Sequence, residues 1–133
     1  MKENKATIMG LQDLERVFQP EDYCLLGSVI PNALASGGSY RKIGDLDGFA
    51  DKKNEVKAVE KFMTLGYQVK PVKGLGNLIG VRPLRFSKKT TQIDIFFGEM
   101  GKNGFRYPLK AGFSLNIPLV AYQPCTRLKL DKI

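Results

Sequence analysis

Three aspartates carry the strongest chemical signal in this sequence. Asp45 and Asp47 stand one residue apart in "DLDGFAD", and Asp94 follows later in "QIDIFFG". On a strand, residues i and i+2 point to the same face roughly 7 Å apart, so Asp45 and Asp47 can bind one cation together. Asp94 lies between two isoleucines of a predicted strand, where an unpaired charge is costly and a partner is required. If the two strands are neighbours, the three carboxylates can hold Mg²⁺ or Mn²⁺, as in enzymes that transfer phosphoryl groups in line.

A second group of residues is suited to binding phosphate. Gly27 and Ser28 follow the run "YCLL", where a predicted strand changes into a short helix. Backbone N–H groups and the serine hydroxyl can bind a phosphate there, and glycine allows its close approach. Arg41, next to Lys42, can neutralise a nucleoside triphosphate, although a surface cation explains it equally well.

Helices and strands alternate around these residues in the predicted secondary structure. Apolar positions in "LQDLERVF" predict a helix over 11–18 with Pro20 as a stop, and "YCLLGSVI" begins a buried strand. "VIPNALA" predicts a short helix, and the segment 45–51 predicts the next strand. The clearest helix is predicted in "KKNEVKAVEKFMTLG", which ends at Gly66 and has an apolar stripe made of Val56, Val59, Phe62 and Met63.

The second half of the sequence predicts mainly strands. "YQVKPV", "NLIGVRPLRF" and "TTQIDIFFG" are strand-like, with "SKK" at 87–89 as the turn of an antiparallel hairpin. Pro83 would interrupt a central ladder, so we expect the middle run to be bulged or at an edge. "RYPLKAGFS" and "IPLVAYQ" are short strands or loop, and "PCTRLKLDKI" looks like the start of a helix. This order predicts an α+β or mixed α/β fold, with helices packed on a mixed central sheet.

Composition sets limits on the class of protein. The 133 residues fit a single domain over 1–133, and the net charge of +8 favours anionic partners such as nucleotides or RNA. The absence of histidine excludes a His-based triad, a His general base and every His-containing zinc site. Cys24 and Cys125 follow no metal or redox spacing. No apolar run suits a signal peptide or a membrane span, so we expect a cytoplasmic protein with no membrane partner.

The order of the motifs resembles the nucleotidyltransferase superfamily, especially its small, minimal members. The resemblance covers about residues 23–98, with "LLGSV" as the Gly-Ser signature, "DLDGF" as the paired acids and "QIDIFFG" as the third acid. It implies that Gly27 and Ser28 bind the phosphates of a nucleoside triphosphate. It also implies that Asp45 and Asp47 hold magnesium, while Asp94 helps to activate an acceptor hydroxyl.

Some features of the resemblance bear on partners. The tail "YQPCTRLKL" is similar to a segment of such proteins, but its helix is barely begun in this sequence. We therefore expect the usual helical partner to be missing, or to be supplied by another chain in an oligomer or a complex. The acceptor stays open between RNA, a small molecule and a protein side chain.

Three other interpretations stay open. The acids can be loop carboxylates that bind no metal, with Asp94 paired to a lysine. A metal-dependent nuclease would also use clustered acids, although no acid-x-Lys strand follows at the expected spacing. A non-catalytic module of the same fold can bind nucleic acid or a partner protein through "RPLRFSKK", where cations surround an aromatic ring: Arg82, Arg85, Lys88 and Lys89 around Phe86. A solvated hairpin tip explains that stretch equally well.

Overall fold

The computed structural model describes residues 5–26, 46–72, 83–101 and 104–118. Asp47 and Asp94 lie within these ranges. The short helix predicted over 29–35 and the predicted C-terminal helix lie outside them. The other predicted site residues also lie outside, namely Gly27, Ser28, Arg41 and Asp45.

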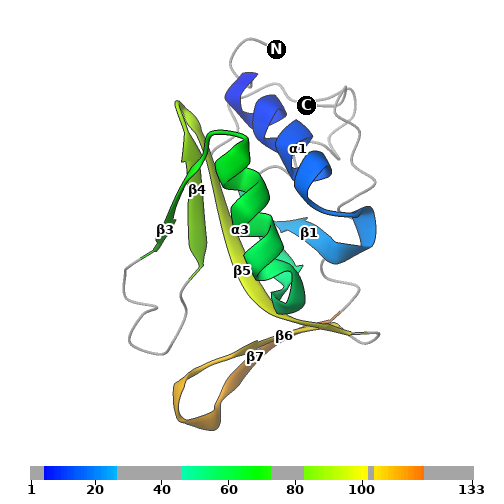
Figure 1. Ribbon diagram of the computed structural model, residues 1–133. Helices are drawn as coiled ribbons and strands as arrows, with labels where there is room; N and C mark the ends of the chain where they lie inside the picture. The colour runs from blue at the N-terminus through cyan, green and yellow to red at the C-terminus, as the bar shows by residue number, and fades with distance from the viewer. Residues whose placement is uncertain (1–4, 27–45, 73–82, 102–103, 119–133) are drawn as a thin grey trace.

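Seven strands in the described parts of the chain form one mixed sheet. They are β1 (Tyr23–Leu26), β2 (Leu46–Asp51), β3 (Gln68–Pro71), β4 (Leu84–Lys88), β5 (Thr91–Gly101), β6 (Gly104–Pro108) and β7 (Ser114–Pro118). The main order is β1-β2-β5-β4-β3, in which β2 and β5 run parallel and the other neighbours antiparallel. β6 pairs with the far end of β5, and the β6–β7 hairpin projects from that end of the sheet (Figure 1). The predicted mixed α/β class is confirmed.

Two helices, α1 (Lys5–Val17) and α3 (Glu55–Thr64), pack on one face of the sheet (Figure 1). α1 confirms the helix predicted over 11–18 and extends it toward the N-terminus. Gly10 lets α1 lie close to the sheet, because a Cβ at this position would be 2.8 Å from Leu46 Cδ1. None of the helices in the described ranges is long and apolar enough to span a membrane.

α3 forms where it was predicted but turns a different side to the core. Ala58 and Phe62, four residues apart, are buried. Val56 and Met63 are 69% and 59% exposed, so the expected four-residue apolar stripe was wrong for these two positions. Residues four apart share one helix face, and the sheet selects the face that carries the phenylalanine.

The end of α3 confirms Gly66 as the helix cap. Gly66 has a φ of +95°, in the region that favours glycine. Its N–H donates to the Met63 carbonyl and the Tyr67 N–H donates to the Phe62 carbonyl, both at 3.0 Å, which is the Schellman pattern. The Tyr67 ring then contacts the Phe62 ring, with 5.1 Å between centroids. The chain is thereby fixed for its entry into β3.

A buried hydrogen bond joins this cap to α1. The Tyr67 hydroxyl donates to Asp13 Oδ2 at 2.6 Å, and Arg16 Nη1 donates to Asp13 Oδ1 at 2.6 Å. Burial, together with the hydrogen bond to Asp13, raises the pKa of Tyr67 well above its usual value. The Tyr67 hydroxyl therefore keeps its proton at neutral pH and donates the hydrogen bond to Asp13.

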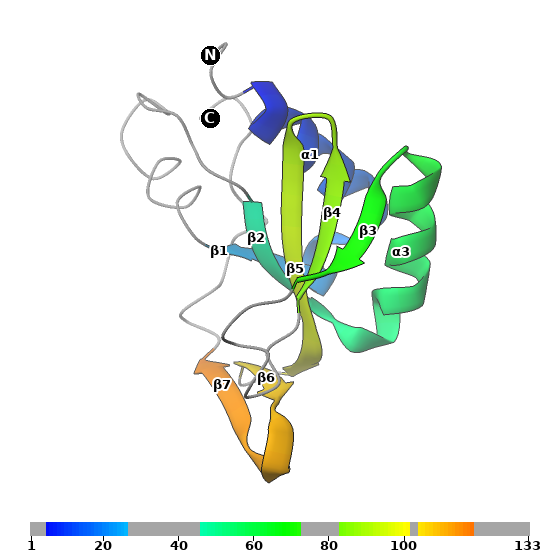
Figure 2. The same cartoon turned by 90° about the vertical axis from the view of Figure 1, so that its left-hand side faces the viewer.

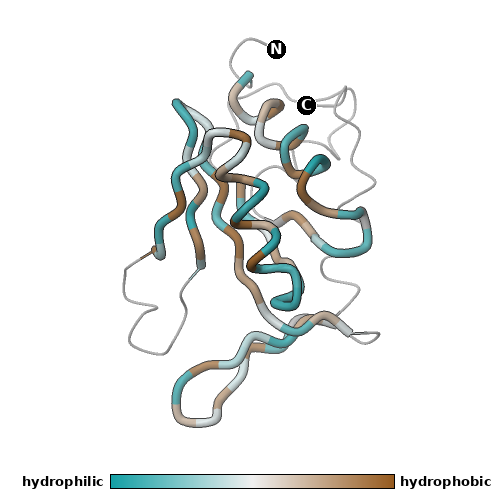
Figure 3. Tube along the Cα trace, in the orientation of Figure 1, coloured by the Kyte–Doolittle hydropathy of each residue, from teal (hydrophilic) through white to brown (hydrophobic). Residues whose placement is uncertain are grey.

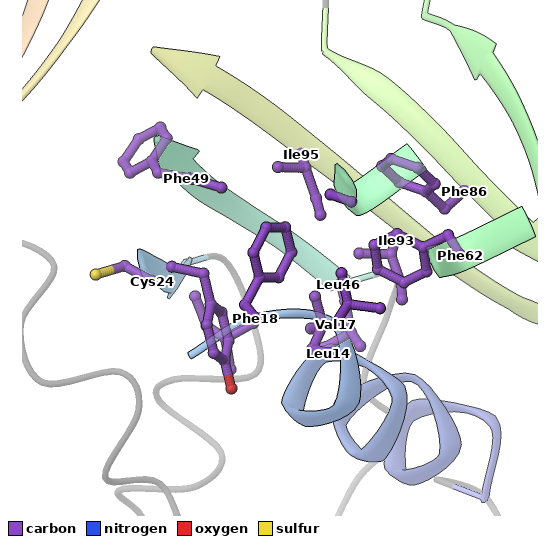
Figure 4. Close-up of a cluster of buried hydrophobic side chains, with 14 of the residues drawn as sticks. Leu14, Val17, Phe18, Cys24, Leu46, Phe49, Phe62, Phe86, Ile93 and Ile95 are labelled. Carbon is purple, nitrogen blue, oxygen red and sulfur yellow. The ribbon is translucent and has the colours of Figure 1, made fainter. Parts of the chain in front are cut away.

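The main core lies between the helices and the sheet. Figure 4 shows the apolar side chains that meet there. They come from α1, from the residue after it, from α3 and from three strands: Leu14, Val17, Phe18, Leu46, Phe62, Phe86, Ile93 and Ile95. Phe62 and Phe86 are both 0% exposed, with 4.2 Å between their ring centroids. Phe49 instead points away from α1 (Figure 4) and stacks on Phe105 of β6 at 4.2 Å.

β4 and β5 form the predicted antiparallel hairpin, with the turn at Lys89 and Thr90 rather than at 87–89. Figure 3 shows hydrophilic residues at this tip. The expectation that Pro83 would bulge this strand or place it at an edge was wrong. Pro83 precedes the first residue of β4, and β4 lies between β5 and β3. The Pro83 carbonyl accepts a hydrogen bond from the Val72 N–H at 2.9 Å.

β5 also carries an exposed charge network beyond the main core. Glu99 accepts hydrogen bonds from Arg106 Nη1 at 3.1 Å and from Lys52 Nζ at 3.3 Å. These bonds, with that from Arg106 the stronger influence, hold the pKa of Glu99 below its usual value. The network joins β5 to β6 and to the 3-10 helix Lys52–Asn54.

Candidate functional site

One row of side chains crosses the sheet and brings together two of the predicted acids. Asp47 of β2 is in register with Asp94 of β5, which is in register with Arg85 of β4. Arg85 is in turn in register with Lys70 of β3. Cross-strand partners point to the same face of a sheet, so the row presents two carboxylates followed by two cations. The strands of Asp47 and Asp94 are neighbours, which is the condition for a shared site.

The charged row lies on the face opposite the helices. Leu46 and Ile93, the sequence neighbours of Asp47 and Asp94, are 1% and 0% exposed and lie against Gly10 of α1. Side chains alternate between the two faces along a strand, so Asp47 and Asp94 point away from α1. In Figure 2 the strands face the viewer and α1 lies behind them.

Arg85 and Asp94 form a bidentate ion pair. Arg85 Nε donates to Asp94 Oδ1 at 2.8 Å, and Arg85 Nη2 donates to Oδ2 at 3.0 Å. The side chain of Asp94 is 12% exposed and that of Arg85 is 40% exposed. A nearly buried carboxylate requires such compensation, and the guanidinium fork also fixes its orientation. The partner that Asp94 needs in its strand is thus an arginine, not the lysine of the ion-pair interpretation.

The same face becomes aromatic at the next pair along β2 and β5. Phe49 and Phe96 are in register, with 5.9 Å between ring centroids. Phe105 stacks on Phe49, and Tyr107 contacts Phe96 at 5.8 Å between centroids. Phe105 and Tyr107 come from β6, so the β6–β7 hairpin packs over this end of the face. The carboxylates are therefore bounded on one side by a small aromatic cluster, Phe49, Phe96, Phe105 and Tyr107.

Asp47 and Asp94 are suitable ligands for a divalent cation. They offer hard carboxylate oxygens from adjacent strands, the donors that Mg²⁺ prefers together with phosphate oxygens and water. Each oxygen of Asp94 accepts one bond from Arg85, and a carboxylate oxygen can accept more than one. Within the described residues no group of three metal-binding side chains occurs. The described strands contribute a pair of acids.

The remaining predicted residues can be related to this pair only by their sequence positions. Leu26, the last residue of β1, is in register with Asp47. Gly27 and Ser28 come directly after Leu26, and Asp45 comes directly before β2. Their own placement, like that of Arg41, lies outside the described ranges.

Arg85 and Lys70 are members of the row that the sequence did not assign to it. Arg85 appeared only in the basic stretch considered for nucleic-acid binding, with Phe86 as its aromatic residue. Phe86 is 0% exposed and packs on Phe62, so it cannot stack on a base. Strand alternation was the available signal, because a core residue at 86 directs Arg85 to the opposite face.

Comparison with known proteins supports the fold. No protein-family model and no curated protein matches the sequence. Among solved structures, the chain is similar to lincosamide antibiotic adenylyltransferase LnuA in its lincomycin-bound crystal structure, with a TM-score of 0.55 and 17% identity. The similarity covers 88% of this chain and 68% of that one. The chain therefore has a nucleotidyltransferase-like fold.

Proposed function

We propose that the protein is a metal-dependent nucleotidyltransferase, which moves a nucleoside monophosphate from a nucleoside triphosphate to an acceptor hydroxyl. The observation that carries this proposal is the register that sets Asp47 beside Asp94 on parallel strands. The similarity in fold to an adenylyltransferase supports it. The net charge of +8 is also suited to an anionic substrate.

In this proposal the acids hold the cation and receive the acceptor. Asp47 and Asp94, with Asp45 next to β2 in the sequence, would bind Mg²⁺ or Mn²⁺. When bound, the cation supplies neutralisation of the phosphate charge that develops as pyrophosphate leaves. Asp94 also orients the acceptor hydroxyl and takes its proton on a carboxylate oxygen. Arg85 holds Asp94 in one orientation through the two bonds to its oxygens.

The triphosphate would lie on the β1 side of Asp47. Gly27 and Ser28 follow β1 in the sequence and would bind the β and γ phosphates, with Arg41 contributing positive charge. The acceptor oxygen then attacks the α-phosphorus while the bond to pyrophosphate breaks on the opposite side. In this proposal the acceptor would lie beyond Asp94, toward β4.

The variant Asp47→Asn tests the proposal. Wild-type protein should be stabilised against thermal unfolding only when Mg²⁺ and a non-hydrolysable triphosphate are both present. At ligand concentrations about 100-fold above Kd, the stabilisation should be about 2.7 kcal/mol. Asp47→Asn should bind the triphosphate no better with Mg²⁺ than without it, as measured by isothermal titration calorimetry.

Asp51→Asn is the matched control, since it removes the same charge from the same strand. Asp51 lies at the end of β2 and accepts a hydrogen bond from the Lys53 N–H, which an asparagine oxygen can also accept. This variant should bind the metal and triphosphate as the wild type does. Equal metal-dependent binding by Asp47→Asn and the wild type would rule out the proposed function.

A further inference from the structure

The cationic end of the charged row narrows the choice of acceptor. Resting on the proposed function, we infer that Arg85 and Lys70 bind a phosphate group of the acceptor. The acceptor is then a nucleotide, either free or at the end of a nucleic-acid strand, rather than an uncharged alcohol. Its hydroxyl meets Asp94 while its phosphate lies over β4 and β3.

The order of the row determines which substrate meets these cations. The residues proposed to bind the triphosphate follow β1 in the sequence, and β1 pairs with β2 on the side opposite β5. An in-line attack requires the acceptor to enter from the side opposite the leaving pyrophosphate. That side leads from Asp94 to Arg85 and then to Lys70, one strand further at each step. Strands are spaced about 4.8 Å apart, so both cations are within reach of a phosphate on the same sugar as the hydroxyl.

Both cations present donors at the surface. The Arg85 side chain is 40% exposed even though its Nε and Nη2 groups bind Asp94. Lys70 is exposed, and it belongs to none of the ion pairs among the described residues. A guanidinium beside a flexible ammonium suits a phosphate group, because both carry a positive charge and the lysine adds three N–H donors on a flexible stem.

The surroundings of the row favour a polar acceptor over an apolar one. On the same face, Gln68, Ser87 and Gln92 are in register across β3, β4 and β5 and offer hydrogen-bonding groups. The aromatic cluster on the other side is already filled, since Phe49 is 6% and Phe105 is 1% exposed. The accessible part of this face therefore offers charges and hydrogen bonds.

Acceptor binding can be measured separately from triphosphate binding. Wild-type protein is saturated with Mg²⁺ and a non-hydrolysable triphosphate and is then titrated with a nucleoside, its 5′-monophosphate and a trinucleotide RNA. The two phosphate-bearing probes should bind at least about tenfold more tightly than the nucleoside. Tighter binding of the trinucleotide than of the monophosphate would identify a strand end as the acceptor, and equal binding a free nucleotide.

Variants assign this preference to the two cations. Lys70→Gln should weaken binding of the phosphate-bearing probes about five- to tenfold and leave the nucleoside and the triphosphate unaffected. Arg85→Gln should also weaken binding of the phosphate-bearing probes, but because Arg85 also orients Asp94 this variant should change metal and triphosphate binding as well, so Lys70→Gln is the diagnostic variant. Arg85→Lys, which keeps the charge, should restore part of the loss. Lys57→Gln on α3, on the helix-covered side of the sheet, removes the same charge as a control and should change nothing.

The two levels of the proposal fail in different ways. If Lys70→Gln weakens the triphosphate instead of the acceptor, or if the nucleoside binds as tightly as its monophosphate, the acceptor assignment is overturned while nucleotidyl transfer stands. If the wild type shows no metal-dependent triphosphate binding, the proposed function is overturned, and the acceptor assignment with it.

Discussion

The bond between Arg85 and Asp94 is measurable as a coupling free energy. A double-mutant cycle needs the wild type, Arg85→Met, Asp94→Asn and the double variant, each unfolded with urea at pH 7. Two charge-assisted bonds of 2.8 and 3.0 Å reach a carboxylate that is only 12% exposed, and a hydrogen bond to a charged group contributes about 1.5–3 kcal/mol. Because the arginine side chain is 40% exposed, solvent competes, and we expect a coupling of about 1–2 kcal/mol.

A second ion pair in the same sheet provides the control. Arg106 and Glu99 are joined by one bond of 3.1 Å, with side chains that are 47% and 45% exposed. The cycle of Arg106→Met and Glu99→Gln should therefore give a smaller coupling than the cycle at Arg85 and Asp94. If the two couplings are equal, Arg85 does not hold Asp94 in place and the reasoning about its orientation is refuted.

The same proteins, unfolded with and without MgCl₂, test the link to the proposed metal site. Arg85 places a positive charge beside one of the two carboxylates, which opposes a divalent cation there. Arg85→Met should therefore gain more stability from Mg²⁺ than the wild type gains, and Asp94→Asn should gain less. The opposite ranking would contradict a cation bound by Asp94.

Three further predictions concern the fold and its charges. Tyr67→Phe removes the hydrogen bond to Asp13 and should lower the free energy of unfolding by about 1–2 kcal/mol at neutral pH. The folded-state pKa of Tyr67 is raised above its unfolded value of about 10, so this stabilisation is present below that pH and is lost as the pH rises further. Urea unfolding at roughly pH 7 to 11 should show a steeper loss of stability with rising pH for the wild type than for Tyr67→Phe. Gly98→Ala sets a Cβ 2.6 Å from a backbone oxygen of β6 and should cost about 1–3 kcal/mol in thermal melting, whereas Gly101→Ala, 3.9 Å from its nearest neighbour, should cost less. Glu99 has a lowered folded-state pKa, so its ion pairs stabilise the fold at neutral pH and lose this effect as the pH falls through that pKa; an NMR titration midpoint at or above that of an ordinary glutamate would be contrary to this assignment.

Local sequence patterns were sufficient for most elements but not for their faces. The residues of α3 are recognisable from apolar periodicity and from the cap at Gly66, which are properties of the helix itself. Which side of α3 is buried depends on the sheet, and there Phe62 fits against Phe86 while Val56 and Met63 remain exposed. Sequence periodicity predicts the helix but does not identify the surface against which it packs.

Register explains why the sequence suggested the acids but not their cations. The interiors of β2 and β5 are apolar enough to be recognised, so Asp47 and Asp94 could be singled out as charges within strands. Arg85 meets Asp94 because the hairpin turns at Lys89 and Thr90, and a slip of one residue would direct Arg85 into the helix-covered core. The turn was expected at 87–89, from which this pairing could not be deduced.

The parallel contact between β2 and β5 has a consequence for the order of events during folding. Asp47 and Asp94 come from distant parts of the chain, and α3 and the β3–β4 pair must be accommodated between them. Contacts of such long sequence separation close slowly, whereas the β4–β5 hairpin needs only a short loop. A chain that has formed the β4–β5 hairpin already holds Arg85 against Asp94, but Asp47 is not yet beside Asp94. Metal affinity should consequently appear in the last kinetic phase of refolding, when the β5 amides that pair with β2 become protected from hydrogen exchange.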